Sequence, residues 1–248
     1  MRLFGLIGFP LSHSFSVKYF AEKFKKEDIT NCVYQNFEIP SINDFPQIIS
    51  NNPNLCGLNI TIPYKEKIIP FLDELSLEAK NIGAVNTVQI IRNNGKIKLI
   101  GHNTDCYGFQ QSLKPLLQLN HHKALILGTG GAAKAVEYVL KNLGLEVLYV
   151  SRNPEKINEI NYTDLEGDVF SKFKVIVNST PLGMYPQIND CPNIPYELIE
   201  KDNLLYDLIY NPSETKFMLE GLKKGATVEN GLAMLQLQAE KAWEIWNS

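Results

Sequence analysis

The chain has 248 residues, of which 44% are apolar and 21% charged, and its formal net charge is −3. This is the composition of an ordinary soluble globular protein with enough length for two hydrophobic cores. The small negative charge gives no reason to expect nucleic acid as a partner.

The cysteines, the histidines and the apolar runs bear on the compartment, on metal binding and on membrane association. The four cysteines are widely spread without a CxxC pair, which fits reduced thiols in a cytoplasm. The four histidines have no metal-ligand spacing with them, so no metal is expected. The opening apolar run is too short for a signal peptide, and no run of about 18 apolar residues exists to span a membrane. We therefore expect a cytoplasmic protein without a membrane partner.

Strands and helices alternate along the first hundred residues. Strands are predicted at residues 3–7, 32–39, 55–61, 84–91 and 96–100, and helices at 16–27, 42–50, 64–72 and 77–82. Asn93-Asn94-Gly95 is typical of a hairpin turn between the last two strands. Such alternation indicates an open α/β sheet.

A second unit begins near Asp105. Its strands are predicted at residues 123–127, 145–150, 175–179, 204–208 and 226–228, with a helix over 135–143. The last helix, 231–246, carries Leu235, Ala239, Ala242 and Trp246 on one stripe, and we infer that it returns to the first domain and leaves a cleft between the units. The predicted fold is two-domain α/β: a substrate domain, 1–104 completed by 232–248, and a Rossmann-type domain, 105–231.

A glycine-rich turn joins a strand to a helix in the second unit. It reads Gly128-Thr129-Gly130-Gly131-Ala132-Ala133 and follows the apolar residues 124–127. Glycine lets the backbone pass close to a pyrophosphate, and the helix N-terminus faces the anion with free N–H groups. Ala133 stands at the third glycine position, which the pattern permits. The turn predicts a dinucleotide site.

The residues after the next strand indicate which dinucleotide binds. That strand leads into Ser151-Arg152-Asn153, where an NAD-binding protein usually offers an acidic residue. Arg152 and Lys156, four apart on one expected helical face, can neutralise the 2′-phosphate of NADP. NADP is therefore the predicted cofactor, although two solvated basic residues in an ordinary turn would look the same.

The segment from Asn59 to Lys65 places polar groups beside a core strand. Asn59 and Thr61 point one way, whereas Leu58, Ile60 and Ile62 point to the core. Pro63 is expected to start a helix with Lys65 just inside it. A lysine there would lie at the positive end of the helix dipole, which favours proton release. The charged run Lys65-Glu66-Lys67 can equally be a solvent-exposed face of the protein.

Further polar clusters accompany Lys65. The serine-rich loop 11–16 follows the first strand at the edge where ligands of open α/β sheets bind, and its hydroxyls could hold a carboxylate or cap a helix. Asn86 stands at a strand start. Asp105 lies at the crossover between domains, where it can face the cleft or cap the next helix. Gln238 lies on the apolar stripe of the last helix and needs buried partners.

Eight segments in order carry a family resemblance. They are HSFS (13–16), NITIPYK (59–65), GAVNT (83–87), GHNTD (101–105), GTGGAA (128–133), NSTPLGM (178–184), DLIY (207–210) and ENGLAMLQLQA (229–239). Together they resemble the shikimate dehydrogenases nearly end to end. The resemblance implies reversible, NADPH-dependent reduction of 3-dehydroshikimate to shikimate in the biosynthesis of chorismate and aromatic amino acids, by a monomer or a homodimer.

The resemblance also implies roles for particular residues. The catalytic pair would be Lys65 and Asp105. The substrate carboxylate would be bound by Ser14, Ser16 and Tyr210. The ring hydroxyls and the site around them would be held by Asn59, Thr61, Asn86, Asp105 and Gln238, and Lys65 would also contact the substrate. The cofactor would be bound by Gly128, Gly130, Gly131, Ala132, Ala133, Ser151, Arg152, Asn153, Lys156, Leu208 and Gly231, with the loop 178–184 nearby.

Three positions depart from the family pattern. Val17 stands where proline is usual, Cys106 where glycine is usual, and Ser151 where asparagine is common. None of them removes a group that the chemistry needs.

Other functions remain open on the sequence. A quinate/shikimate dehydrogenase with relaxed cofactor use is the nearest alternative, since Arg152 and Lys156 argue against NAD but do not exclude quinate. A non-catalytic NADP-responsive module is another, and intact Lys65 and Asp105 argue against it. Methylenetetrahydrofolate dehydrogenase has the same layout, but the paired serines and Tyr210 suit a small carboxylic acid better.

Overall fold

The structure is a computed structural model that describes residues 1–11 and 15–248. The chain forms two compact units, one of residues 1–104 with 239–248 and one of residues 105–238. The division falls within the last helix, α8 (Leu232–Trp246), so its second half belongs to the first unit. The sequence-based division placed all of 232–248 with the first domain. The α/β fold class is confirmed.

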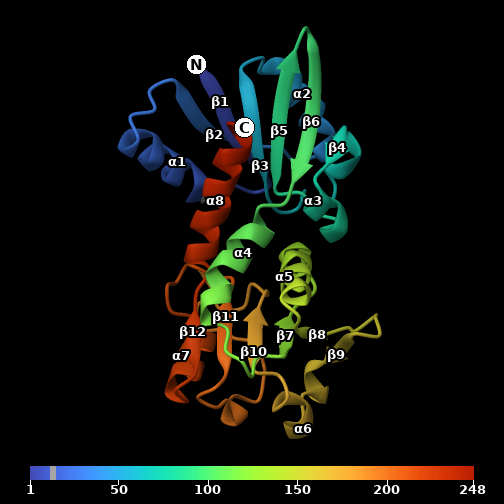
Figure 1. The fold of residues 1–248 in the computed structure, drawn as a ribbon, viewed down its shortest axis with the longest axis vertical. Coiled ribbons are helices and arrows are strands. Elements are labelled where there is room, and N and C mark those ends of the chain that lie inside the picture. The colour runs from blue at the N-terminus through green and yellow to red at the C-terminus, as the bar shows by residue number, and fades with distance from the viewer. Residues whose placement is uncertain (12–14) are drawn as a thin grey trace. The chain divides into compact units, whose positions relative to one another are not determined.

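The first unit is built on a mixed six-stranded sheet (Figure 1). Its strands, in spatial order, are β2 (Cys32–Glu38), β1 (Arg2–Gly8), β3 (Leu55–Ile60), β5 (Thr87–Asn93), β6 (Lys96–His102) and β4 (Glu74–Leu75). The first three are parallel, whereas β5 runs antiparallel to β3 and β6. The β5–β6 hairpin closes through Asn94 and Gly95, with φ of +48° and +76°, as the Asn-Gly pair predicts.

Two hydrophobic clusters flank this sheet. Helix α1 (Phe15–Lys26) and the second half of α8 form one cluster, in which Phe20 and Trp246 pack with Phe4. Helices α2 (Phe45–Asn51) and α3 (Leu77–Ile82) contribute to the other cluster. An ion pair of 2.7 Å between the nearly buried Lys23 of α1 and Glu240 of α8 holds the two helices together.

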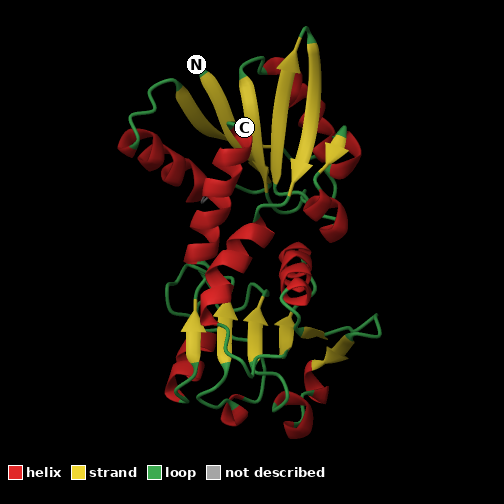
Figure 2. Ribbon diagram, in the orientation of Figure 1, coloured by secondary structure: helices red, strands yellow, loops and turns green. Residues whose placement is uncertain are grey.

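The second unit is built on a parallel six-stranded sheet; Figure 2 draws the strands of both units as yellow arrows. In spatial order they are β12 (Thr227–Glu229), β11 (Leu204–Asp207), β10 (Val175–Asn178), β7 (Lys123–Leu127), β8 (Glu146–Ser151) and β9 (Glu159–Asn161). Counted from β7 as strand one, the order is 3-2-1-4-5-6, that of the dinucleotide-binding α/β fold. In this fold ligands bind at the carboxyl ends of the strands.

Four α-helices of the second unit lie wholly within it. They are α4 (Asp105–Leu113), α5 (Gly131–Asn142), α6 (Gly167–Phe170) and α7 (Lys216–Lys223). Phe109 of α4 packs edge-on against Tyr206 of β11, and Phe170 and Phe217 lie in a separate cluster with Ile176 of β10. Buried on both faces, the central strands are almost entirely apolar, as a parallel sheet requires.

The predicted helix over residues 64–72 is wrong. The chain makes successive turns there and then a short 3-10 helix, Ile69–Phe71. Pro70 has no N–H to donate to the Glu66 carbonyl, so an α-helix cannot continue through this position. The prediction that Ile62 points to the core is also wrong, because β3 ends at Ile60 and Ile62 is 74% exposed.

Candidate active site

A buried polar network occupies the carboxyl end of β3 and the start of β5. Asn59 of β3 accepts a hydrogen bond from the Tyr34 hydroxyl at 2.8 Å and donates to Thr87 Oγ1 at 3.2 Å. Its Nδ2 also lies 3.4 Å from the Asn86 carbonyl oxygen. Asn59 lies on the sheet face opposite to Leu58 and Ile60, as the strand alternation predicts.

Asn86 extends the network to the end of the first unit. Its Oδ1 accepts the Thr104 backbone N–H at 2.6 Å, and its Nδ2 donates to Thr104 Oγ1 at 3.0 Å. Thr104 directly precedes Asp105, the first residue of α4 and a buried carboxylate. Asn86 therefore fixes the backbone immediately before Asp105.

The Lys65 segment is attached to the same part of the first unit. The Lys65 carbonyl accepts the Val85 N–H at 2.7 Å, so Lys65 lies beside the residue preceding Asn86. The Tyr64 hydroxyl donates to the Ile39 carbonyl at 2.6 Å and anchors the segment from its other side. Thr61 is half-buried and donates its N–H to the Ile7 carbonyl. No α-helix begins at Pro63, so the helix-dipole argument for Lys65 does not hold.

The structure describes only some of the residues that are expected to bind the substrate carboxylate. Ser14 lies outside the described residues. Ser16 is the second residue of α1 and is half-buried. Tyr210 is 36% exposed in the second unit, and burial raises the pKa of its hydroxyl. Gln238 is buried, as its place on the apolar stripe predicts, and its Nε2 donates to the Leu235 carbonyl at 2.9 Å.

The glycine-rich turn of the second unit has the form that a pyrophosphate site requires. Gly128 has a φ of +96°, a conformation that favours glycine, and α5 begins at Gly131 with Gly130 as its N-cap. A Cβ on Gly130 or Gly131 would meet no atom within 4 Å, so the space before the helix N-terminus is open. Ala133 is buried, and its carbonyl accepts a hydrogen bond from Tyr149. Half-buried Ala132 lies in the same first turn.

The loop 178–184 packs against this turn. Ser179 donates from its hydroxyl to the Leu127 carbonyl at 2.7 Å, and Thr180 lies close to Gly128. Leu208, after β11, donates its N–H to the Asn178 carbonyl. A Cβ on Gly231 would lie 2.1 Å from the Leu208 carbonyl oxygen, so no larger residue fits there without a backbone shift. The glycine-rich turn, the loop 178–184, Leu208 and Gly231 are all expected at the cofactor, and they thus lie together in the second unit.

A buried carboxylate that the sequence reasoning did not assign connects these segments. Asp207, at the end of β11, is fully buried and accepts hydrogen bonds from Asn178 Nδ2, the Ile209 N–H and Thr215 Oγ1. Burial raises the pKa of Asp207 to about 6, against the lowering effect of these three donors. Its place in the DLIY segment, one of the eight segments that carry the family resemblance, is the only sequence signal for Asp207. Nothing in the sequence indicates that its side chain is buried.

The residues after β8 adopt a bend and not the predicted helix. Arg152, Asn153 and Lys156 are exposed, and Ser151 Oγ accepts the Asn153 N–H at 3.2 Å. The expectation that Arg152 and Lys156 share a helical face is wrong. Bends and a turn lead directly into β9, which begins at Glu159, and the Glu159 carboxylate accepts the Glu155 N–H at 2.8 Å.

Arg152 is nevertheless held in a defined backbone position. Its carbonyl accepts a hydrogen bond from Asn161 Nδ2 at 2.9 Å. Burial raises the pKa of nearby Tyr162, and the Arg152 guanidinium opposes that rise. Lys156 pairs instead with Glu159, at 3.4 Å.

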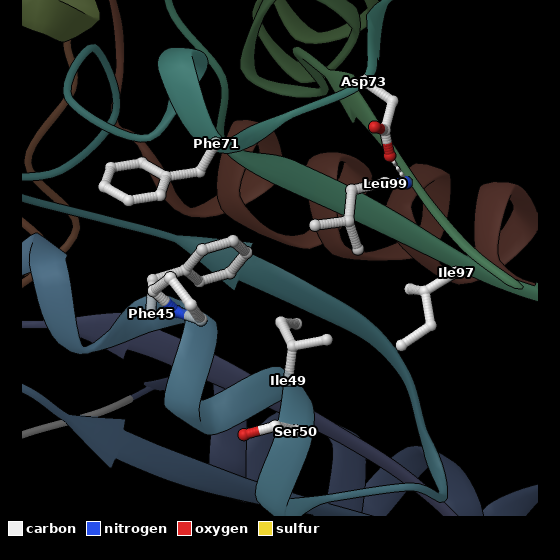
Figure 3. A pocket seen from close by; sticks show the side chains of 8 residues that line it. Phe45, Ile49, Ser50, Phe71, Asp73, Ile97 and Leu99 are labelled. Atoms are coloured by element: carbon white, nitrogen blue, oxygen red, sulfur yellow. Dashed lines mark hydrogen bonds between the residues drawn. The ribbon is translucent and has the colours of Figure 1, made fainter.

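A hollow of about 340 Å³ lies in the first unit (Figure 3). Figure 3 shows Phe45, Ile49, Phe71 and Leu99 around it, with the Asp73 carboxylate bonded to the Leu99 N–H. The lining is mainly apolar and includes none of the predicted site residues. The hydroxylated acid that the family resemblance implies requires hydrogen-bonding groups, so we place the candidate site at the polar network.

Three further properties concern metals, thiols and membranes. Among the described residues, no cluster of three or more histidine, cysteine, aspartate or glutamate side chains could hold a metal ion. All four cysteines are free thiols. Within residues 1–11 and 15–248, no helix has the length and apolar character needed to cross a membrane.

The chain is similar to known dehydrogenases in both sequence and structure. Residues 6–88 match the family model described as the shikimate dehydrogenase substrate binding domain. The chain is 40% identical to the NADP(+) shikimate dehydrogenase of Carboxydothermus hydrogenoformans, over 99% of this chain and 91% of that one. Shikimate 5-dehydrogenase from Thermus thermophilus, solved with NADP(H) and shikimate, has a TM-score of 0.85 at 31% identity, covering 99% of this chain and 93% of that chain.

The strand order and these comparisons define a nicotinamide-dinucleotide-dependent α/β oxidoreductase. Within this class, the chain belongs to the shikimate dehydrogenase family. A quinate dehydrogenase from Corynebacterium glutamicum in complex with NAD is also similar, with a TM-score of 0.86 at 26% identity over 99% of this chain and 93% of that one.

Proposed function

We propose that this protein catalyses the reversible reduction of 3-dehydroshikimate to shikimate with NADPH, a step in aromatic amino acid biosynthesis. The observation that carries the proposal is the presence of both halves of such an enzyme in one chain. Residues 6–88 match a substrate binding domain, and the second unit has the strand order of a dinucleotide-binding sheet.

The residues of the second unit suit NADP. The open space at Gly130 and Gly131 would take the pyrophosphate at the N-terminus of α5. Arg152 would bind the 2′-phosphate through its guanidinium fork, with Lys156, Ser151 and Asn153 beside it. Leu208 and Gly231 would line the nicotinamide end. When bound, NADPH supplies the hydride for the reduction.

The polar network suits a hydroxylated carboxylic acid. Ser14, Ser16 and Tyr210 would bind the carboxylate. The hydroxyls of the ring would be bound by Asn59, Thr61, Asn86, Asp105 and Gln238. Most of these groups are amides and hydroxyls, which can donate to or accept from an alcohol.

Lys65 and Asp105 are the proposed catalytic pair. Reduction turns the ketone oxygen into an alkoxide unless a proton arrives, and a cationic Lys65 would donate that proton and stabilise the developing charge. Asp105 would orient the lysine and the adjacent substrate hydroxyl. In support, the Lys65 carbonyl is bonded to Val85, and Asn86 holds the residue preceding Asp105.

Quinate oxidation is a second candidate, favoured by the similarity to a quinate dehydrogenase. An assay of the purified protein with shikimate or quinate, each with NADP or NAD, distinguishes the two by absorbance of the reduced nicotinamide. We expect turnover with shikimate and NADP to exceed the other three combinations. No turnover with any combination would overturn the proposed function, and equal turnover of quinate would favour the alternative.

The cellular setting is also a proposal. Four free thiols suit a reducing compartment, and we expect the protein in the cytoplasm. We expect it to be a monomer or a homodimer, which sedimentation equilibrium at two protein concentrations would distinguish.

A further inference from the structure

Tyr34 is a buried tyrosine on β2 whose hydroxyl reaches into the polar network. Its ring stacks on Phe20 at a centroid distance of 4.5 Å, and its hydroxyl donates to Asn59 Oδ1 at 2.8 Å. Burial raises the pKa of this hydroxyl, and hydrogen bonding from Ser16 opposes that rise. Tyr34 therefore lies next to two residues assigned to the substrate, one on α1 and one on β3.

The contacts of Asn59 with Asn86 and with Tyr34 together determine how its side-chain amide is oriented. The backbone carbonyl of Asn86 can only accept a hydrogen bond, so the amide nitrogen of Asn59 must face it. Oδ1 of Asn59 is then left facing Tyr34, which supplies its donor. Asn59 is only 5% exposed, so an Oδ1 without that donor would be a buried, unsatisfied acceptor.

We propose that Tyr34 is a positioning residue for substrate binding, which pairs Oδ1 of Asn59 and so holds the side-chain amide in the orientation that the Asn86 carbonyl sets. The hydroxyl and the ring of Tyr34 have different functions. The ring contributes to the core with Phe20 and Trp246, whereas the hydroxyl holds Asn59. This inference rests on the proposed function, because Asn59 is a substrate ligand only there.

The test removes the hydroxyl and leaves the ring. We expect Tyr34→Phe to raise the dissociation constant for shikimate about tenfold, as measured by titration calorimetry, with the constant for NADP unchanged. Tyr196→Phe is the matched control. It removes another part-buried hydroxyl, bonded to the Pro192 carbonyl at 2.8 Å in the second unit, and should leave shikimate binding unchanged.

A second variant separates positioning from packing. Phe20→Leu loosens the ring stack beneath Tyr34 but keeps the hydroxyl, so it should lower the melting temperature and change shikimate affinity by less than about twofold. If Tyr34→Phe and Phe20→Leu weaken shikimate binding equally, Tyr34 has only a structural role and the inference fails.

A double-mutant cycle tests whether Tyr34 acts through Asn59. In an Asn59→Ala background, Tyr34→Phe should have less than a twofold effect on shikimate affinity, because its target is gone. A full tenfold effect in that background would overturn the inference while leaving the proposed function intact. If the unaltered protein bound no shikimate, the proposed function itself would fail.

Discussion

The side chain of Asn178 donates from Nδ2 to Oδ1 of Asp207 at 3.0 Å and so links the carboxyl ends of β10 and β11. The other contacts of this pair extend to the proposed cofactor site. Asn178 Oδ1 accepts both the N–H and the hydroxyl of Thr180, beside the glycine turn, and Asp207 accepts the Ile209 N–H. A change at Asp207 should therefore alter the segments that would line the nicotinamide end.

The first prediction concerns Asp207→Asn and pH. Burial raises the pKa of Asp207 from its ordinary 3.8 to about 6, so the folded protein holds this proton more tightly than the unfolded chain. The protonated Asp207 therefore stabilises the folded protein, fully so below about pH 4. This stabilisation is lost as the pH rises through about 6. Between pH 4.5 and pH 7, the stability of the unaltered protein relative to the variant should fall by about 2 kcal/mol.

Urea unfolding of both proteins at these two pH values measures this difference. Exposed Asp190→Asn, in the same unit, gives the baseline for a surface aspartate. A difference between the unaltered protein and Asp207→Asn that stays constant from pH 4.5 to pH 7 would show that Asp207 does not titrate in this range.

A pair of glycine substitutions should separate folding from cofactor binding. In Gly231→Ala the new Cβ would lie 2.1 Å from the Leu208 carbonyl oxygen, a rigid backbone atom, so we expect a loss of roughly 1–3 kcal/mol in stability and weaker NADP binding. In Gly130→Ala the Cβ meets no protein atom, so stability should change little while NADP binding weakens. Thermal unfolding with and without NADP measures both effects. Equal stability losses in the two variants would contradict this interpretation.

Much of the fold could be predicted from the sequence because local signals agreed with the final packing. The apolar strand at residues 124–127, the glycines after it and the helix that follows all indicate one βαβ unit, and β7 and α5 form there. The pair Asn94-Gly95 is likewise sufficient to predict the hairpin between β5 and β6.

The errors occurred where tertiary contacts or proline override the local pattern. Apolar spacing suggested a helix from Tyr64, but Pro70 prevents it, and the Lys65 carbonyl bonds to Val85 from a distant segment. The role proposed for Tyr34 is not visible in the sequence, because its bond to Asn59 joins strands on either side of β1. Such pairings depend on strand order, which no single segment encodes.

Replacement of Lys65 tests the proposed proton donor. We expect Lys65→Ala to lower turnover by about 10²–10⁴-fold, the usual contribution of a general acid, with NADP affinity nearly unchanged. Lys67→Ala is the matched control, since Lys67 is an exposed lysine two residues away in the same run of turns. Steady-state rates together with NADP titration measure both quantities. If Lys65→Ala kept its turnover, Lys65 would lose its catalytic role.

Replacement of Arg152 tests the choice between NADP and NAD. The two cofactors differ by the 2′-phosphate, and a charge-assisted bond to a phosphate contributes far more than one to a neutral hydroxyl. Arg152→Ala should therefore raise KM for NADPH by roughly 10- to 100-fold and change KM for NADH by less than about threefold. Lys156→Ala should have a smaller effect, because this side chain is 70% exposed and pairs with Glu159. Equal losses for NADPH and NADH in Arg152→Ala would mean that its guanidinium does not contact the 2′-phosphate.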